Sequence, residues 1–128
     1  MQKEQVAKMG LHGRHAEFTC NFHVDQLIDS HDPVFAGHYP HFAIYPGALL
    51  VDRMWRAVVQ HAAMSGVKLA LTKVHRVNFH HPVFPGTKIS LKCACESPLN
   101  VPLCVRLEVM TDRSIATARM EFGVVHAN

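Results

Sequence analysis

The sequence predicts an α+β domain in which a curled antiparallel sheet wraps around one long central helix. A helical apolar pattern runs over residues 47–64, and alternating apolar and polar residues before and after it indicate strands. A helix that is apolar nearly all round is normally covered by other structure. The strands follow one another through short connections, which is typical of an antiparallel sheet. The sheet must therefore curl around the helix to cover it.

The length and composition fit one globular domain over residues 1–128, with residues 1–13 as a loose N-terminus. Of the 128 residues, 48% are hydrophobic and 18% are charged, so the chain can bury a core of its own. No run of about 18 apolar residues occurs, so no membrane contact is expected. The first residues lack the apolar stretch of a secretory signal, and we expect a cytoplasmic protein.

The first alternating segment is residues 14–24, which reads as a half-buried strand. Residues 25–46 are punctuated by prolines and by Gly37, and we expect them to be irregular. Their aromatic and aliphatic content is too high for a solvated loop. This segment should therefore pack against another part of the protein.

The helix is expected to begin at Gly47, after Pro46, and to end before Gly66. Its narrow polar stripe holds Arg53, Arg56 and Gln60. Four extended segments follow, with a hairpin turn at 111–114 and another connection at 97–100: residues 68–79, 87–96, 101–110 and 115–125. One strand, one enclosed helix and a meander of long strands make the arrangement called the hot-dog fold.

The charge distribution and the spacing of possible metal ligands argue against nucleic-acid binding and against a metal site. The net charge of +3 comes without a basic cluster, so nucleic-acid binding is not expected and an acidic partner protein fits better. The eleven histidines are scattered singly or in pairs without a metal-binding spacing, so no metal site is predicted. The four cysteines are not spaced like a metal cluster either. Cys93 and Cys95 share one strand face, and buried free thiols are expected there rather than a redox pair.

The most informative segment runs from His38 to Asp52. It places a histidine on a proline-rich loop, a Pro-Gly start of a helix, and a carboxylic acid within the first two helical turns. A base, free backbone N–H groups and an acid are the parts needed to remove water from a 3-hydroxyacyl group.

The segments 35–40 (Phe-Ala-Gly-His-Tyr-Pro) and 44–52 resemble the active-site signature of the 3-hydroxyacyl-acyl-carrier-protein dehydratases of type II fatty acid synthesis. Residues 78–86 (Asn-Phe-His-His-Pro-Val-Phe-Pro-Gly) resemble a second element of that family. The resemblance begins at about residue 14 and implies a hot-dog fold and a cofactor-free dehydration. The chain departs from the family pattern by Asp52 in place of the usual Glu, His41 in place of Gly, and Thr87 in place of Asp.

The resemblance implies a role for each residue of the signature. His38 is the general base that takes the proton alpha to the thioester, since imidazole is largely neutral near working pH. Asp52 supplies or relays a proton to the departing 3-hydroxyl group. Gly47 presents its N–H to the thioester carbonyl. The structural alternatives are a hydrogen-bonded loop histidine for His38, an i,i+4 ion pair with Arg56 for Asp52, and a plain helix start for Gly47.

Aromatic and basic side chains around the signature are candidates for binding. The walls of an acyl tunnel could be formed by Tyr39, Phe42, Tyr45, Trp55 and Phe79, with plain core packing as the alternative. Three arginines could bind an acidic acyl carrier protein or the phosphate of its phosphopantetheine arm: Arg53, Arg56 and Arg76. The alternative for these cations is a solvated basic face.

The resemblance also implies a dimer whose sheets join edge to edge, with the histidine of one subunit facing the acid of the other. The sequence predicts dehydration of (3R)-hydroxyacyl-carrier thioesters to trans-2-enoyl thioesters in fatty acid, polyketide or polyene biosynthesis. Two alternatives stay open. One is a hot-dog acyl thioesterase, and the other is a non-catalytic subunit that binds acyl carrier protein, in a homodimer or beside a different hot-dog chain.

Overall fold

The computed structural model describes residues 6–11, 14–19, 21–35, 44–96 and 102–126. The described residues contain the long helix α1 (Gly47–Met64) and the short 3-10 helix η1 (Pro33–Phe35). They also contain these strands: β1 (Val6–Leu11), β2 (Arg14–Thr19), β3 (Phe22–Leu27), β4 (Leu69–Phe79), β5 (Lys88–Cys95), β6 (Leu103–Met110) and β7 (Ser114–Val124).

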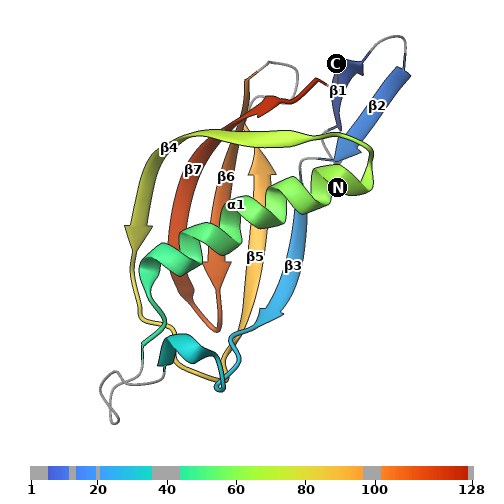
Figure 1. Ribbon diagram of the computed structural model, residues 1–128. Helices are drawn as coiled ribbons and strands as arrows, with labels where there is room; N and C mark the ends of the chain where they lie inside the picture. The colour runs from blue at the N-terminus through green and yellow to red at the C-terminus, as the bar shows by residue number, and fades with distance from the viewer. Residues whose placement is uncertain (1–5, 12–13, 20, 36–43, 97–101, 127–128) are drawn as a thin grey trace.

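Five of the strands form one antiparallel sheet in the order β3-β5-β6-β7-β4. The sheet curls, and α1 lies across its concave face (Figure 1). The predicted hot-dog arrangement is confirmed. The helix predicted over residues 47–64 has the bounds of α1, and the four later strands lie within one or two residues of their predicted ranges.

The core fills the space between α1 and the concave face of the sheet. The strands β5, β6 and β7 bury every second side chain, as the alternating sequence pattern predicts. The largest fully buried side chains include Phe122, Met120, Leu107, Leu91 and Met54. The helix contributes a stripe at helical spacing: Leu50, Met54, Ala57, Val58 and Ala62.

The C-terminal end of α1 is closed by a Schellman motif. The N–H of Val67 donates to the carbonyl of Ala62, and the N–H of Gly66 donates to that of Ala63, each at 3.0 Å. Gly66 has φ 77°, a left-handed conformation that costs glycine least. Val67 is fully buried beyond the turn and anchors the chain before β4.

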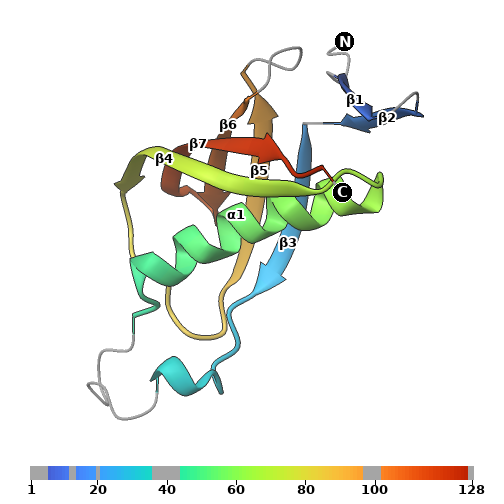
Figure 2. The same cartoon turned by 45° about the horizontal axis from the view of Figure 1, so that its top comes forward.

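The N-terminal third differs from the prediction in two places. Residues 6–11, expected within a loose terminus, form β1, which pairs with β2 in a separate two-stranded ribbon (Figure 2). The strand expected over residues 14–24 is interrupted, since β2 ends at Thr19 and β3 begins at Phe22. At the break, the side-chain Oδ1 of Asn21 accepts the N–H of Cys95 at 3.0 Å. An asparagine side chain that replaces a backbone acceptor in this way competes with regular pairing.

The cysteines also differ from the prediction. Cys95 is disulfide-bonded, so the expected free thiol is wrong at this position. Cys93 is free and buried, and burial raises the pKa of its thiol to about 12. Cys104 is free and half-buried.

No described helix has the length and apolar character needed to cross a membrane.

Strand β4 is one edge of the five-stranded sheet and carries two irregularities in its pairing with β7. The register shifts between Leu71 and Lys73 and again between Val74 and Arg76. Thr72 and His75 are therefore extra residues in β4, each without a register partner. Bulges of this kind bend a strand and redirect its side chains.

Candidate functional site

The N-terminal end of α1 offers backbone donors. Pro46 precedes the helix without a side-chain cap, and its carbonyl accepts the N–H groups of Leu49 and Leu50 at 3.0 and 3.3 Å. The N–H groups of Gly47 and Ala48 belong to the first turn, where a helix supplies no intrahelical acceptor and where its dipole is positive. This helix end can therefore stabilise negative charge on a carbonyl oxygen.

The ring of Phe79, at the end of β4, lies against Gly47. A Cβ atom at position 47 would be only 2.8 Å from Cζ of Phe79, so the close approach depends on glycine at this position. Phe79 is 53% exposed, so part of its ring is open to contacts outside this chain. Two of the residues predicted from the sequence for the site, Gly47 and Phe79, are thus brought together.

Asp52 lies further along α1 and pairs with Arg56. Its Oδ2 accepts from Nε of Arg56 at 2.8 Å, and the side chain of Asp52 is 40% exposed. The i,i+4 ion pair weighed as the structural alternative is therefore present. Within one chain, the carboxyl of Asp52 is therefore partly open to solvent.

Trp55 and Arg56 form one patch beside Asp52. The guanidinium of Arg56 lies 4.9 Å from the ring centroid of Trp55, within cation–π distance. Trp55 is half-buried and packs against the core. It therefore has one face for the core and part of its surface for other contacts.

Tyr45 and Arg53 hold the segment that leads into α1. Tyr45 is buried in the core, and its N–H donates to the carbonyl of Val83 at 2.8 Å. Nε of Arg53 donates to the hydroxyl of Tyr45, and Nη1 of Arg53 donates to Oε1 of Gln26, both at 2.9 Å. These contacts fit the core alternative for Tyr45 and a positioning role for Arg53.

Arg76 belongs to a row of three arginines that sequence reasoning did not find. Arg119 is opposite Arg106 in β6 and opposite Arg76 in β4. Like charges directly opposite one another destabilise a sheet. Glu96 offsets part of this cost, with an oxygen 2.7 Å from Nη2 of Arg119 and another 3.8 Å from Nε of Arg106. The residues line a cavity of about 320 Å³.

The arginine row could not be identified from the sequence because it depends on the pairing of β4 with β7, which comes much later in the chain. Strand alternation alone gives only which residues of one strand share a face. Three other predicted residues, His38, Tyr39 and Phe42, lie outside the described residues.

Sequence comparison places the chain among dehydratases. The family model described as ApeI-like (ApeI dehydratase) matches residues 14–117. The 3-hydroxyacyl-[acyl-carrier-protein] dehydratase FabZ of Oleidesulfovibrio alaskensis is 31% identical over 72 residues, which cover 52% of this chain and 47% of that protein. FabZ of Thermotoga petrophila is 28% identical over 100 residues, which cover 76% of this chain and 72% of that protein. The chain thus spans about half the length of the first of these curated relatives.

Solved structures share the fold. The dehydratase heterocomplex ApeI:P from Xenorhabdus doucetiae has a TM-score of 0.66 at 16% identity and covers 95% of this chain and 99% of that one. The fluoroacetyl-CoA thioesterase FlK has a TM-score of 0.67 at 18% identity, and the match covers 83% of this chain and 85% of the thioesterase chain. One fold thus serves lyases and thioesterases, so the family rests on sequence. Because its model spans most of the sequence, the chain belongs to the ApeI-like family of dehydratases.

Proposed function

We propose that this protein converts (3R)-hydroxyacyl thioesters on an acyl carrier protein into trans-2-enoyl thioesters and water. The observation that carries the proposal is the match to the dehydratase family over residues 14–117, a range that includes His38, Gly47 and Asp52. The exposed carboxylate of Asp52 is on the same helix as the first-turn N–H groups of Gly47 and Ala48, which have no intrahelical acceptor, and this supports the proposal. No cofactor takes part in the proposed reaction.

In the proposed reaction the N–H of Gly47 polarises the thioester carbonyl, which makes the proton on the alpha carbon more acidic. His38 takes that proton, and the electron pair of the C–H bond forms the new double bond. The bond from carbon 3 to its hydroxyl breaks, and Asp52 donates the proton with which the hydroxyl leaves as water. Return of the proton from His38 to Asp52 restores both groups.

The contact between Asp52 and Arg56 does not prevent this role. An exposed i,i+4 pair on a helix is worth about 0.3–0.5 kcal/mol. Both side chains are well exposed, at 40% for Asp52 and 58% for Arg56. A histidine or a substrate hydroxyl that approaches Asp52 can therefore displace Arg56 at small cost.

A dimer that joins two sheets through β4 completes the proposed site. The edge strand β4 leaves one side of its backbone without a sheet partner among the described residues, and it exposes Val74 to 39% and Phe79 to 53%. Edge strands of this length with exposed apolar residues favour pairing with another chain. In the proposal His38 of one subunit serves Asp52 of the other. A different hot-dog subunit could take the second place, and the similar structure from Xenorhabdus doucetiae is described as a dehydratase heterocomplex.

Replacing Val74 by Lys should disrupt this dimer. A lysine on each of two adjoining edge strands places like charges in the interface, which costs more than the small loss of apolar area. We expect light scattering after gel filtration to give the mass of one subunit and the enoyl product to disappear. Val24→Lys, at a valine that is 37% exposed on the opposite edge strand β3, is the comparison for added charge alone. A Val74→Lys protein that remains dimeric would move the interface away from this part of β4.

For the carrier protein we propose the row Arg76, Arg119 and Arg106 as the docking surface; Arg56 lies on α1, on the other side of the sheet, and is left out. Only Glu96 among the described residues is paired with this row, and a phosphate or a carboxylate is the ligand that guanidinium groups prefer. Arg53 is left out because its Nε and Nη1 donate to Tyr45 and Gln26, which hold the guanidinium against the protein. The cytoplasmic location stays a prediction, and the disulfide at Cys95 counts against a reducing compartment.

The test of the function is product analysis. Purified protein is incubated with 3-hydroxyacyl carrier protein, and intact mass spectrometry follows the acyl group. Loss of one water with the thioester retained is the expected result. Release of free 3-hydroxy acid would favour the thioesterase. An untouched substrate that still binds the protein, and that reacts only after a second hot-dog subunit is added, would favour the heterodimer.

A further inference from the structure

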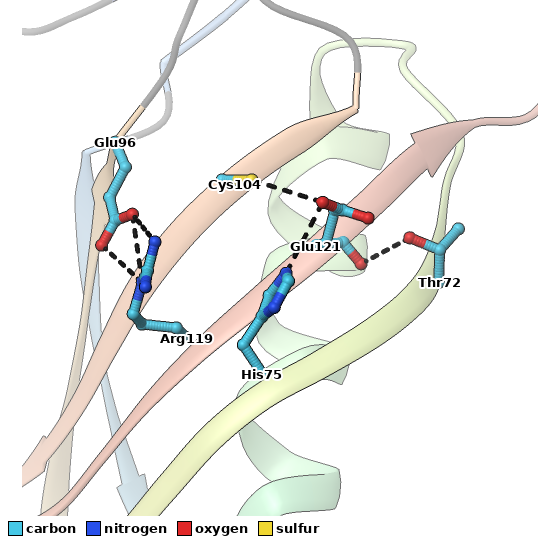
Figure 3. Close-up of polar contacts among 6 residues, drawn as sticks. All are labelled: Thr72, His75, Glu96, Cys104, Arg119 and Glu121. Atoms are coloured by element: carbon cyan, nitrogen blue, oxygen red, sulfur yellow. Dashed lines mark hydrogen bonds and ion pairs between the residues drawn. The ribbon is translucent and has the colours of Figure 1, made fainter.

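Three metal-ligating side chains from different strands meet on the convex face of the sheet, opposite α1: His75, Cys104 and Glu121 (Figure 3). Nε2 of His75 is 3.5 Å from Oε1 of Glu121, and Sγ of Cys104 is 3.6 Å from the same oxygen. The donor atoms all lie within 4.8 Å of one another. None of these residues belongs to the proposed dehydration site.

The sheet holds the three residues together. Cys104 and Glu121 are direct register partners on β6 and β7, between core residues that point the other way. His75 is the extra residue of the second bulge in β4, and the bulge redirects its side chain toward Glu121. The hydroxyl of Thr72, at the first bulge, donates to the backbone carbonyl of Glu121 at 3.0 Å. Each of the two bulges in β4 thus provides a residue that contacts Glu121: Thr72 at the first and His75 at the second.

The separations are those of ligands around one ion. Tetrahedral zinc with bonds of about 2.05 Å to N, 2.1 Å to O and 2.3 Å to S places N and O about 3.4 Å apart, and S and O about 3.6 Å apart. The measured distances to Oε1 of Glu121 are 3.5 and 3.6 Å. The donor atoms all lie within 4.8 Å of one another, and His75 is exposed on an edge strand, where its side chain can adjust to an ion.

We propose that His75, Cys104 and Glu121 bind a divalent zinc ion, with water at the fourth position. Thiolate and imidazole ligands select zinc over magnesium or calcium, which prefer oxygen ligands. The side chains of His75 and Glu121 are 31% and 24% exposed, so an ion can enter from solvent without unfolding. The ion would connect the edge strand β4 to β6 and β7.

Zinc binding at this cluster releases a proton. Burial, and then the hydrogen bond to Glu121, raise the pKa of the Cys104 thiol above its ordinary value, so the metal-free thiol is protonated at neutral pH. The S–H bond breaks, the proton goes to the buffer, and the sulfur lone pair forms the bond to zinc. The neighbouring charges are Glu121 in the site and the pair Glu96 and Arg119 beside it.

Titration of the intact protein, with its disulfide kept and oxygen excluded, with Co²⁺ tests the proposal. We expect one equivalent to give a thiolate-to-cobalt absorption band, which equimolar Zn²⁺ abolishes by displacement. Loss of an outer-shell partner lowers metal affinity 10–100-fold, so loss of a ligand should lower it by about 100-fold or more. Cys104→Ser should remove the band, and His75→Gln and Glu121→Gln should each weaken Co²⁺ binding by that factor.

Two controls make the result specific. Glu108→Gln removes a carboxylate four residues along β6 from Cys104, and His80→Gln removes an imidazole just beyond β4. Both should bind Co²⁺ as the wild type does, and circular dichroism should show all variants folded. An absent thiolate band overturns the proposal, as does a band that survives Cys104→Ser. Equal affinities for His75→Gln, Glu121→Gln and the two controls would overturn it as well.

Discussion

Replacing Asp52 by Asn should lower kcat/KM for dehydration by about 10³-fold, the range expected for loss of a general acid. Asparagine keeps the size and the polarity of the side chain but cannot give up a proton. The free energy of unfolding should change little, because the exposed contact with Arg56 is worth about 0.3–0.5 kcal/mol. Steady-state kinetics with a 3-hydroxyacyl carrier substrate, together with urea unfolding, measure both effects.

The matched control is Arg56→Gln, which removes the ion pair but keeps the carboxyl of Asp52. Activity close to that of the wild type is expected for this variant with a soluble thioester substrate. If Asp52→Asn were as active as Arg56→Gln, Asp52 would be only the partner of an ion pair on the helix surface, and the proposed acid would lie elsewhere.

A dimer of two different variants tests whether the His38 and Asp52 of one site come from different subunits. If each site takes His38 from one subunit and Asp52 from the other, inactive His38→Ala and Asp52→Asn subunits restore one site in every mixed dimer. Equal co-expression should then recover about a quarter of the wild-type activity, because half of the dimers are mixed and each has one intact site. Recovery near zero would place both residues of a site in one subunit.

Replacing Phe122 by Ala should lower the free energy of unfolding by about 3–5 kcal/mol, the cost of removing a large buried aromatic side chain. Phe122 is fully buried on β7, a strand with neighbours on both sides. The cavity cannot close easily between the sheet and α1. Urea unfolding followed by circular dichroism, at one protein concentration, measures the loss.

Phe84→Ala is the matched control, since it removes the same atoms from a side chain that is 49% exposed outside the strands. Surface substitutions usually change stability by no more than about 0.5 kcal/mol. Similar losses for the two variants would mean that the sheet does not close over Phe122 as described.

The sequence was sufficient where local periodicity decides the structure. The helix over residues 47–64 and its closure at Gly66 were predicted correctly, because apolar spacing and a glycine past the last turn are both local signals. The later strands were predicted for the same reason. The break at Asn21 was missed because its side chain bonds to Cys95, which no window around residue 21 contains.

The chemistry of side chains was harder to predict than the fold. The contact of Asp52 with Arg56 was foreseeable as a local i,i+4 pair, but the spacing alone did not show that the pair forms. The cluster of His75, Cys104 and Glu121 escapes any search for spaced motifs, since its members meet through β-sheet register and a bulge. Positions brought together by a sheet become visible only once the pairing is known.

The strand order has a consequence for synthesis on the ribosome. Strand β4 pairs with β7, so that Leu69 meets Val124 near the end of the sequence, and β3 pairs with β5. The apolar helix and β4 therefore leave the ribosome long before the strand that holds β4 in the sheet. Non-local pairings of this kind form late and leave apolar surface open to aggregation in the meantime. The growing chain should thus depend on chaperones until β7 has emerged.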